Sequence, residues 1–169
     1  MYKMTCVILA VTFTVFLFSC EKTPQINPEQ ERAVIAETIS SCIGWFKEKD
    51  FNLLFSVVAN DSNYVSVHPT NTVIKGFEQF EANSEIFKNP DFKYVRHELK
   101  DLTINLSQSG KVAWFYCILD DINTWAGQPA NWENARWTGV LEKRQGKWRI
   151  VQQHFSFSTE QIRAEIENQ

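Results

Sequence analysis

The spacing of apolar residues changes about halfway along the chain. From residue 28 to about 49 they recur at helical intervals, so that Ile35, Ile39, Cys42 and Phe46 share one face. Asn27 followed by Pro28 is typical of a helix start, because Asn caps and Pro suits the first helical position. Two shorter helices are expected at 51–58, after the capping residue Asp50, and at 77–88, opened by Gly76.

From Phe92 onward the spacing becomes that of strands, with apolar and polar residues alternating. The expected strands, including two short ones before the third helix, are 64–68, 72–75, 92–105, 112–119, 134–143 and 148–157. The segment 121–133 is expected to be a loop, and the Ser158–Gln161 capping box to start a C-terminal helix. Helices followed by long antiparallel strands predict an α+β fold, with one curved sheet wrapped over the helices.

The N-terminus has the three-part plan of an export signal. Lys3 precedes an almost unbroken apolar run that ends at Ser19 and Cys20, and polar residues follow at once. Leu17-Phe18-Ser19-Cys20 resembles a bacterial lipobox, although Phe18 is bulkier than the usual residue at its position. The resemblance predicts cleavage after residue 19 and lipidation of Cys20. An ordinary secreted protein or an uncleaved anchor remains the alternative.

Composition restricts the class of protein further. The chain has 169 residues, of which 44% are hydrophobic and 14% aromatic, which suits one compact domain rather than a disordered chain. Its formal net charge is −3 and it has no basic run, so nucleic acid is not expected as a partner. Cys42 and Cys117 lie in apolar segments and are expected to be two buried thiols rather than a disulfide.

One stretch near the C-terminus resembles a known family. Arg136 to Ser156 contains an Arg-x-Thr strand, a turn with Gly146, a Trp-x-Ile-Val strand and a His-x-Ser ending. This segment resembles the C-terminal hairpin of SnoaL-like proteins. These belong to the nuclear transport factor 2-like superfamily, in the branch that includes the association domain of calcium/calmodulin-dependent kinases. The order of the upstream elements also fits, over residues 28 to 158.

The resemblance implies a cone-shaped sheet closed by the N-terminal helix, with a pocket at the wide end. It also implies that a homodimer could form through the outer face of the sheet. The expected organisation is a signal peptide at 1–19, a tether at 20–27 and a SnoaL-like domain at 28–169. Such a chain would reside in the bacterial cell envelope, attached to the membrane through the lipid on Cys20.

Strand alternation and the family analogy together suggest which side chains line the cone. In the last strand, Gln152, His154 and Ser156 share a face with Trp148, and in the strand before it Arg136 shares a face with Thr138. Both faces are expected to point inward. The full set of expected pocket residues is Tyr64, His68, Trp114, Tyr116, Arg136, Thr138, Trp148, Gln152, His154 and Ser156.

Three functions remain open from the sequence. The first is a binding protein for a small organic ligand, for which Arg136 would offer a guanidinium suited to an anion. The second is an enzyme of the cyclase, isomerase or dehydratase type, with His154 and Asp120 exchanging protons. The third is an assembly module that uses the outer sheet face, with the pocket incidental.

Sites for metals and cofactors are not expected. The three histidines, His68, His97 and His154, lie on separate segments without the spacing of metal ligands. The sequence also has no glycine-rich phosphate loop, nucleophile elbow or Cys-x-x-Cys motif. No cofactor is therefore predicted.

Overall fold

The computed structural model describes residues 27–167, except for the side chains of 164–166. Its helices are α1 (Pro28–Gly44), α2 (Phe51–Val57), α3 (Phe77–Ser84) and α4 (Thr159–Glu167), with 3₁₀ turns at Trp45–Lys47 and Glu85–Lys88. Its strands are β1 (Val65–Val67), β2 (Val73–Lys75), β3 (Phe92–Leu106), β4 (Val112–Trp125), β5 (Gln128–Pro129), β6 (Trp132–Arg144) and β7 (Lys147–Ser156). The expected signal peptide, Cys20 and most of the tether lie outside the described residues.

The helices begin where their capping residues predict. The Asn27 side chain accepts hydrogen bonds from the backbone N–H groups of Glu29 and Gln30, and Pro28 occupies the first helical position. Asp50 caps α2 by accepting from the N–H of Leu53 at 3.0 Å. At α4, Ser158 and Gln161 each accept a bond from the backbone N–H of the other, which is the reciprocal capping box.

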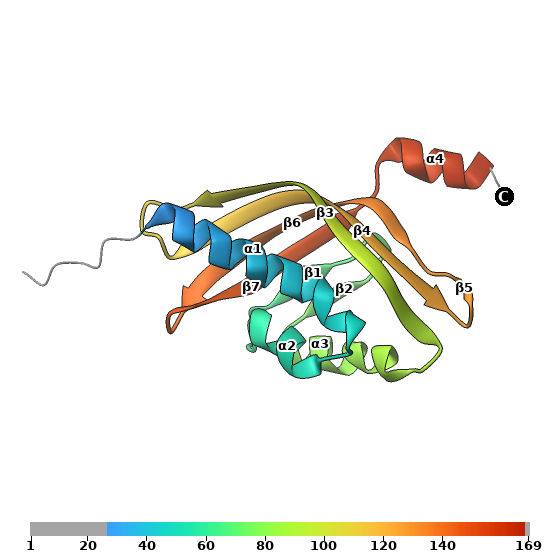
Figure 1. Ribbon diagram of the computed structural model, residues 1–169, viewed down its shortest axis with the longest axis horizontal. Coiled ribbons are helices and arrows are strands. Elements are labelled where there is room, and N and C mark those ends of the chain that lie inside the picture. Colours follow the sequence, from blue (N-terminus) through green and yellow to red (C-terminus); the bar gives the residue numbers. More distant parts are fainter. Residues whose placement is uncertain (1–26, 168–169) are drawn as a thin grey trace, which may run out of the picture.

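The strands form one strongly curled mixed sheet in the order β2-β1-β7-β6-β4-β3, with β5 attached to β4. β1 and β7 run parallel, and the other neighbours are antiparallel. In Figure 1, α1 lies along the curled sheet, α2 and α3 lie together beside its wide end, and α4 projects away from the body. This α+β cone confirms the predicted fold class.

The core fills the space between α1 and the concave face of the sheet. Ile35, Ile39 and Cys42 of α1 are buried there against Phe115 of β4 and Trp137 of β6. The helical spacing of the α1 residues had predicted this face. Burying these apolar side chains is the main stabilising contribution that fixes the helix in the cone.

The expected loop at 121–133 is mostly strand instead. β4 continues to Trp125, turns through Ala126 and Gly127, and β6 begins already at Trp132. The turn is possible because both of its residues have positive φ, Ala126 at 49° and Gly127 at 81°. The prediction of a loop was wrong because the polar residues Asp121 and Asn123 alternate with Ile122 and Thr124 along a strand.

A β-bulge in β7 changes which side chains point inward. Gln152 pairs with Val140 and Ile150 pairs with Leu141, so Val151 is an extra residue on β7. Each extra residue shifts the alternation by one position. Trp148 and Ile150 are therefore inside before the bulge, and Gln153 and Phe155 are inside after it.

Candidate functional site

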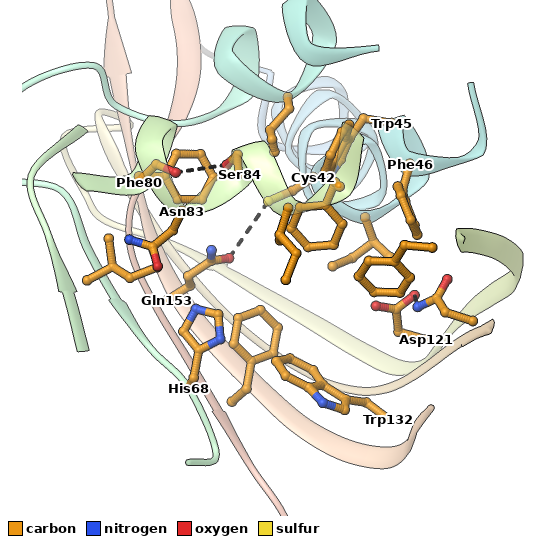
Figure 2. Close-up of a pocket in the computed structure, with 18 of the residues that line it drawn as sticks. Cys42, Trp45, Phe46, His68, Phe80, Asn83, Ser84, Asp121, Trp132 and Gln153 are labelled. Atoms are coloured by element: carbon orange, nitrogen blue, oxygen red, sulfur yellow. Dashed lines mark hydrogen bonds between the residues drawn. The ribbon is translucent and has the colours of Figure 1, made fainter. Parts of the chain in front are cut away.

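A cavity of about 360 Å³ lies between the helices and the wide end of the sheet. That volume is in the range of small-molecule sites. Most of the lining is apolar and much of it is aromatic, from α1, the two 3₁₀ turns, α3 and the inner face of the sheet. The aromatic lining residues are Trp45, Phe46, Phe80, Phe87, Phe92, Trp132 and Phe155. Figure 2 shows Trp45, Phe46, Phe80 and Trp132 around the cavity.

Asp121 and Asn123 form one polar end of the cavity. Both are on β4, where alternation gives them the inner face that Phe115, Cys117 and Leu119 occupy further back. Asn123 Nδ2 donates to Asp121 Oδ1 at 2.9 Å. Burial raises the pKa of Asp121 to about 6, although the bond from Asn123 opposes the shift.

The second polar end contains His68 and Gln153. His68 follows β1, its Nε2 lies 3.3 Å from Ser66 Oγ, and its ring packs against Trp132 and Phe155. Burial lowers the pKa of His68, so its imidazole is neutral at neutral pH. In Figure 2, His68 and Gln153 lie at one side of the cavity and Asp121 lies across it, with Trp132 between them.

Gln153 is held by the protein itself and has little capacity left for a ligand. Its Nε2 donates to the Tyr64 hydroxyl at 2.7 Å and lies 3.3 Å from Ser66 Oγ, while its Oε1 accepts from Cys42 Sγ. Tyr64 is fully buried behind Gln153, and burial raises its pKa. Gln153 therefore shapes the cavity wall, and Tyr64 supports it from outside the lining.

Most of the expected pocket residues lie elsewhere. His68 is part of the lining, and Tyr64 and Trp148 are buried inside the cone but do not line the cavity. The indole Nε1 of Trp148 donates to Glu31 of α1 at 2.6 Å, which fixes it as part of the core. The remaining expected residues are on the outer face of the sheet: Trp114, Tyr116, Arg136, Thr138, Gln152, His154 and Ser156.

The expectation that His154 points inward was wrong, and the β7 bulge is the reason. His154 pairs with Thr138, and Thr138 pairs with Tyr116, so the three share the exposed face of the sheet. Gln153 takes the inner position instead. His154 is accordingly exposed and is not among the lining residues of the cavity.

Arg136 and Thr138 were also assigned to the wrong face. Trp137, between them, is fully buried and stacks on Phe155, with ring centroids 5.2 Å apart. The Arg136 guanidinium instead donates to the carbonyl oxygen of Phe157 on the exposed side. The argument for an anionic ligand, which depended on Arg136 inside the pocket, therefore no longer holds.

Asp120 does not face the cavity. Both of its carboxylate oxygens lie 3.0 Å from Lys100 Nζ, and Oδ1 also accepts from the backbone N–H of Asn134 at 2.8 Å. Burial opposes ionisation, but these bonds and the nearby Arg96 lower the pKa of Asp120 overall. Asp120 is therefore an ionised structural carboxylate, and the inward-facing acid is its neighbour Asp121.

The sequence contained a signal for Asp121 and Asn123 that the loop prediction hid. Ile122 and Thr124 are β-branched and alternate with the two polar residues, a pattern typical of a strand. Continuing the alternation from Phe115 and Cys117 places Asp121 and Asn123 on the inner face. The participation of Asn83 and Ser84 of α3 depends on how α3 packs, so strand alternation could not have indicated them.

Cys42 and Cys117 are buried free thiols, as predicted. Burial raises the pKa of each to about 12, which makes both poor nucleophiles. Between residues 27 and 167, no group of three or more metal-ligating side chains comes together. Over the same residues, no helix has the length and apolar character needed to cross a membrane.

Solved structures with the same architecture have low sequence identity to this chain. A candidate dehydratase of the nuclear transport factor 2-like family from Streptomyces avermitilis superposes with a TM-score of 0.65 at 16% identity, covering 78% of this chain and 99% of that one. A nuclear transport factor 2-like superfamily protein from Salmonella enterica serovar Typhimurium gives a TM-score of 0.64 at 19% identity, covering 79% and 96%. No curated protein sequence matches the chain.

The chain forms an α+β cone with the fold of nuclear transport factor 2-like proteins, and the cavity lies within that cone. The model of the SnoaL-like domain family matches residues 35–160. The chain belongs to the SnoaL-like domain family. Members of one fold family differ widely in chemistry, so function has to be argued from the residues of the cavity.

Proposed function

We propose that this protein binds a small, largely apolar organic molecule in the cavity of its cone. The observation that carries this proposal is the cavity itself. It has a volume of about 360 Å³, a largely aromatic lining and a few polar groups at two ends. Apolar surface supplies the driving force for binding, and fixed polar groups select the ligand. His68 and Asp121 are the side chains placed to make that selection.

The experiment that tests this proposal is native mass spectrometry of gently purified residues 21–169. The wild type should retain a small molecule, or bind added 2-naphthylmethanol in calorimetry. Asn83→Trp should abolish binding, because Asn83 lines the cavity and an indole would fill part of it. Glu81→Trp is the matched control, since Glu81 is an exposed residue on the same helix outside the lining.

His154→Ala serves as a second control and should leave binding unchanged. Equal binding by the wild type and Asn83→Trp would overturn the proposal, because the ligand would then lie outside the cavity. Failure of the wild type to retain any ligand and to bind 2-naphthylmethanol would overturn it as well.

An enzyme that transfers protons is the second candidate function. Asp121 favours it, because a carboxyl group with a pKa of about 6 is suited to exchange protons near neutral pH. The comparison with a candidate dehydratase points in the same direction. In this version Asp121 replaces the expected pair of His154 and Asp120, since neither of those residues lines the cavity.

Export, lipid attachment through Cys20 and homodimer formation belong to the same proposal. The polar residues after Cys20 fit a tether of a domain held at a membrane surface. Support for a homodimer comes from the outer sheet face, where Trp114 and Tyr116 are 47% and 40% exposed. Large exposed aromatic side chains on one face are typical of interaction surfaces.

A further inference from the structure

The Asp121 end of the cavity offers hydrogen-bond acceptors that are not filled within the described chain. Asn123 is only 3% exposed, and its Oδ1 is buried without a donor among the described residues. Its Nδ2 donates to Asp121, which fixes the orientation of the amide and leaves Oδ1 as the free acceptor. Buried acceptors are normally bonded, so this oxygen indicates a donor supplied from outside the described residues.

The charge of the lining restricts what that donor can be. Asp121 is the only Asp, Glu, Lys or Arg among the described residues that line the cavity. Lys100 and Arg96 lie on the other side of the sheet, where they contact Asp120. Lys49 Nζ lies 5.6 Å from the centroid of the Phe46 ring, but it does not line the cavity and donates to the carbonyl oxygen of Asn89. An anionic ligand would therefore face a carboxylate without a compensating cation, whereas a cationic ligand would neutralise it.

The aromatic rings on this side of the cavity also favour a cation. Phe46 packs edge-on against Phe87 and Phe92, with ring centroids 5.0 and 4.9 Å apart, and Trp132 pairs with Asp121 across the strands. Figure 2 shows Asp121 on the same side of the cavity as Phe46 and Trp132. Aromatic faces attract organic cations, and more strongly where water is excluded.

We propose that the ligand of this cavity is an organic amine, whose ammonium group is bound by the Asp121 carboxylate and Asn123 Oδ1. The apolar body of the amine lies among the aromatic rings. The proposal rests on the proposed binding function and names its ligand class. It replaces the anionic ligand that the sequence suggested.

Three probes of nearly equal shape test this assignment: 2-naphthylmethylamine, 2-naphthylmethanol and 2-naphthoate. Their binding is measured by calorimetry at pH 7.5 in phosphate buffer, which contains no competing amine. The ammonium probe should bind at least about tenfold more tightly than the alcohol, because a hydrogen bond to a charged group is stronger than a neutral one. The naphthoate should bind more weakly than the alcohol.

Asp121→Asn should reduce the preference for the amine over the alcohol to near parity. Asp120→Asn is the matched control, because it removes one negative charge at the next residue on the opposite face. The control should keep the preference of the wild type. Thermal melts of both variants show whether each one is folded.

The outcomes separate this inference from the proposed function. If the wild type binds the alcohol as tightly as the amine, the ammonium assignment is overturned while the cavity remains a binding site. If Asp121→Asn keeps the full preference for the amine, the assignment to Asp121 is wrong. If none of the three probes binds, this inference fails, and the proposed function fails with it if native mass spectrometry also shows no retained molecule.

Discussion

Asp120 and Asp121 are consecutive residues of β4, yet their carboxylates lie on opposite faces of the sheet and their pKa values are shifted in opposite directions. Asp120 is ion-paired with Lys100, and its pKa is lowered. Asp121 faces the aromatic cavity, and its pKa is raised to about 6. The strand alternation that separates them also separates a stabilising acid from one that is available to a ligand.

Replacing Asp121 should stabilise the protein at neutral pH. The folded protein holds a proton on Asp121 up to about pH 6, whereas the unfolded chain releases it near 3.8, so folding becomes less favourable as pH rises between these values. We expect Asp121→Asn to raise the free energy of unfolding by about 1–2 kcal/mol at pH 7.5. The gain should disappear near pH 4, as measured by urea unfolding at several pH values.

Asp120→Asn is the control, and its effect should have the opposite sign. A lowered folded pKa means that the ionised carboxylate stabilises the native state above pH 4, and that this stability is lost as pH falls through the folded pKa. Removing this carboxylate should lower the free energy of unfolding by about 1–2 kcal/mol at pH 7.5, since Lys100 loses its buried partner. Changes of the same sign in both variants would contradict the assignment of faces.

Gln153 should matter for stability far more than its neighbour His154. Gln153→Leu leaves the hydroxyl of Tyr64 in the core without its 2.7 Å partner, which should cost about 1–3 kcal/mol. His154→Ala changes an exposed side chain, so its free energy of unfolding should stay within about 0.5 kcal/mol of the wild type. Urea unfolding of both variants checks this, and a larger loss for His154→Ala would show that the β7 bulge is misplaced.

Gly139 should tolerate no side chain. A Cβ at this position would lie 2.5 Å from Phe115 Cε1 and 2.8 Å from the carbonyl oxygen of Gln152. Gly139→Ala should therefore destabilise the protein by about 1–3 kcal/mol through overpacking. Thr138→Ala is the comparison, because Thr138 is the adjacent residue on the exposed face. Similar thermal melts for the wild type and Gly139→Ala would contradict the close packing of β4, β6 and β7.

The outer sheet face should control association. Trp114 and Tyr116 are exposed on that face, so Trp114→Lys with Tyr116→Lys should convert a homodimer to a monomer in analytical ultracentrifugation. Val34→Lys is the control, because Val34 is 53% exposed on α1 rather than on the sheet. A wild type that sediments as a monomer, or a dimer that survives the double substitution, would argue against dimerisation through this face.

Lipid attachment at Cys20 predicts an added mass on the protein and its partitioning into detergent. The full chain expressed in a bacterium should enter the detergent phase and carry the added mass of a lipid at Cys20. Cys20→Ala should carry no lipid mass. Cys6→Ala is the matched control and should carry it, because Cys6 lies within the apolar run ahead of the expected cleavage site. Absence of the lipid mass from the wild type would exclude this anchor.

Much of the fold could be predicted because its signals are local. A capping residue acts on N–H groups two or three positions away, and so Asn27, Asp50 and Ser158 mark helix starts in the sequence. The hydrophobic face of α1 is likewise set by residues three and four apart. The resemblance of the C-terminal hairpin to SnoaL-like proteins then supplied the cone, which local patterns alone do not specify.

The candidate site was predicted poorly because it depends on strand pairing. Whether Gln153 or His154 points inward is decided at Val151, and that residue is extra only in relation to its partners Val140 and Leu141 on β6. Asp121 could have been assigned by following the alternation of β4, but its loop-like neighbours concealed it. Its raised pKa arises from burial in a cavity whose lining includes rings from the 3₁₀ turns and β3.

The linear order of residues is thus enough to define the helix starts, the two buried thiols, most of the strands and the family. The identity of the cavity residues follows only when segments far apart in the chain pack together, because burial and strand register are properties of pairs of segments. Asp121 acquires its raised pKa and its place in the cavity lining in this way. The same carboxyl group one residue earlier, at Asp120, is held by a lysine instead.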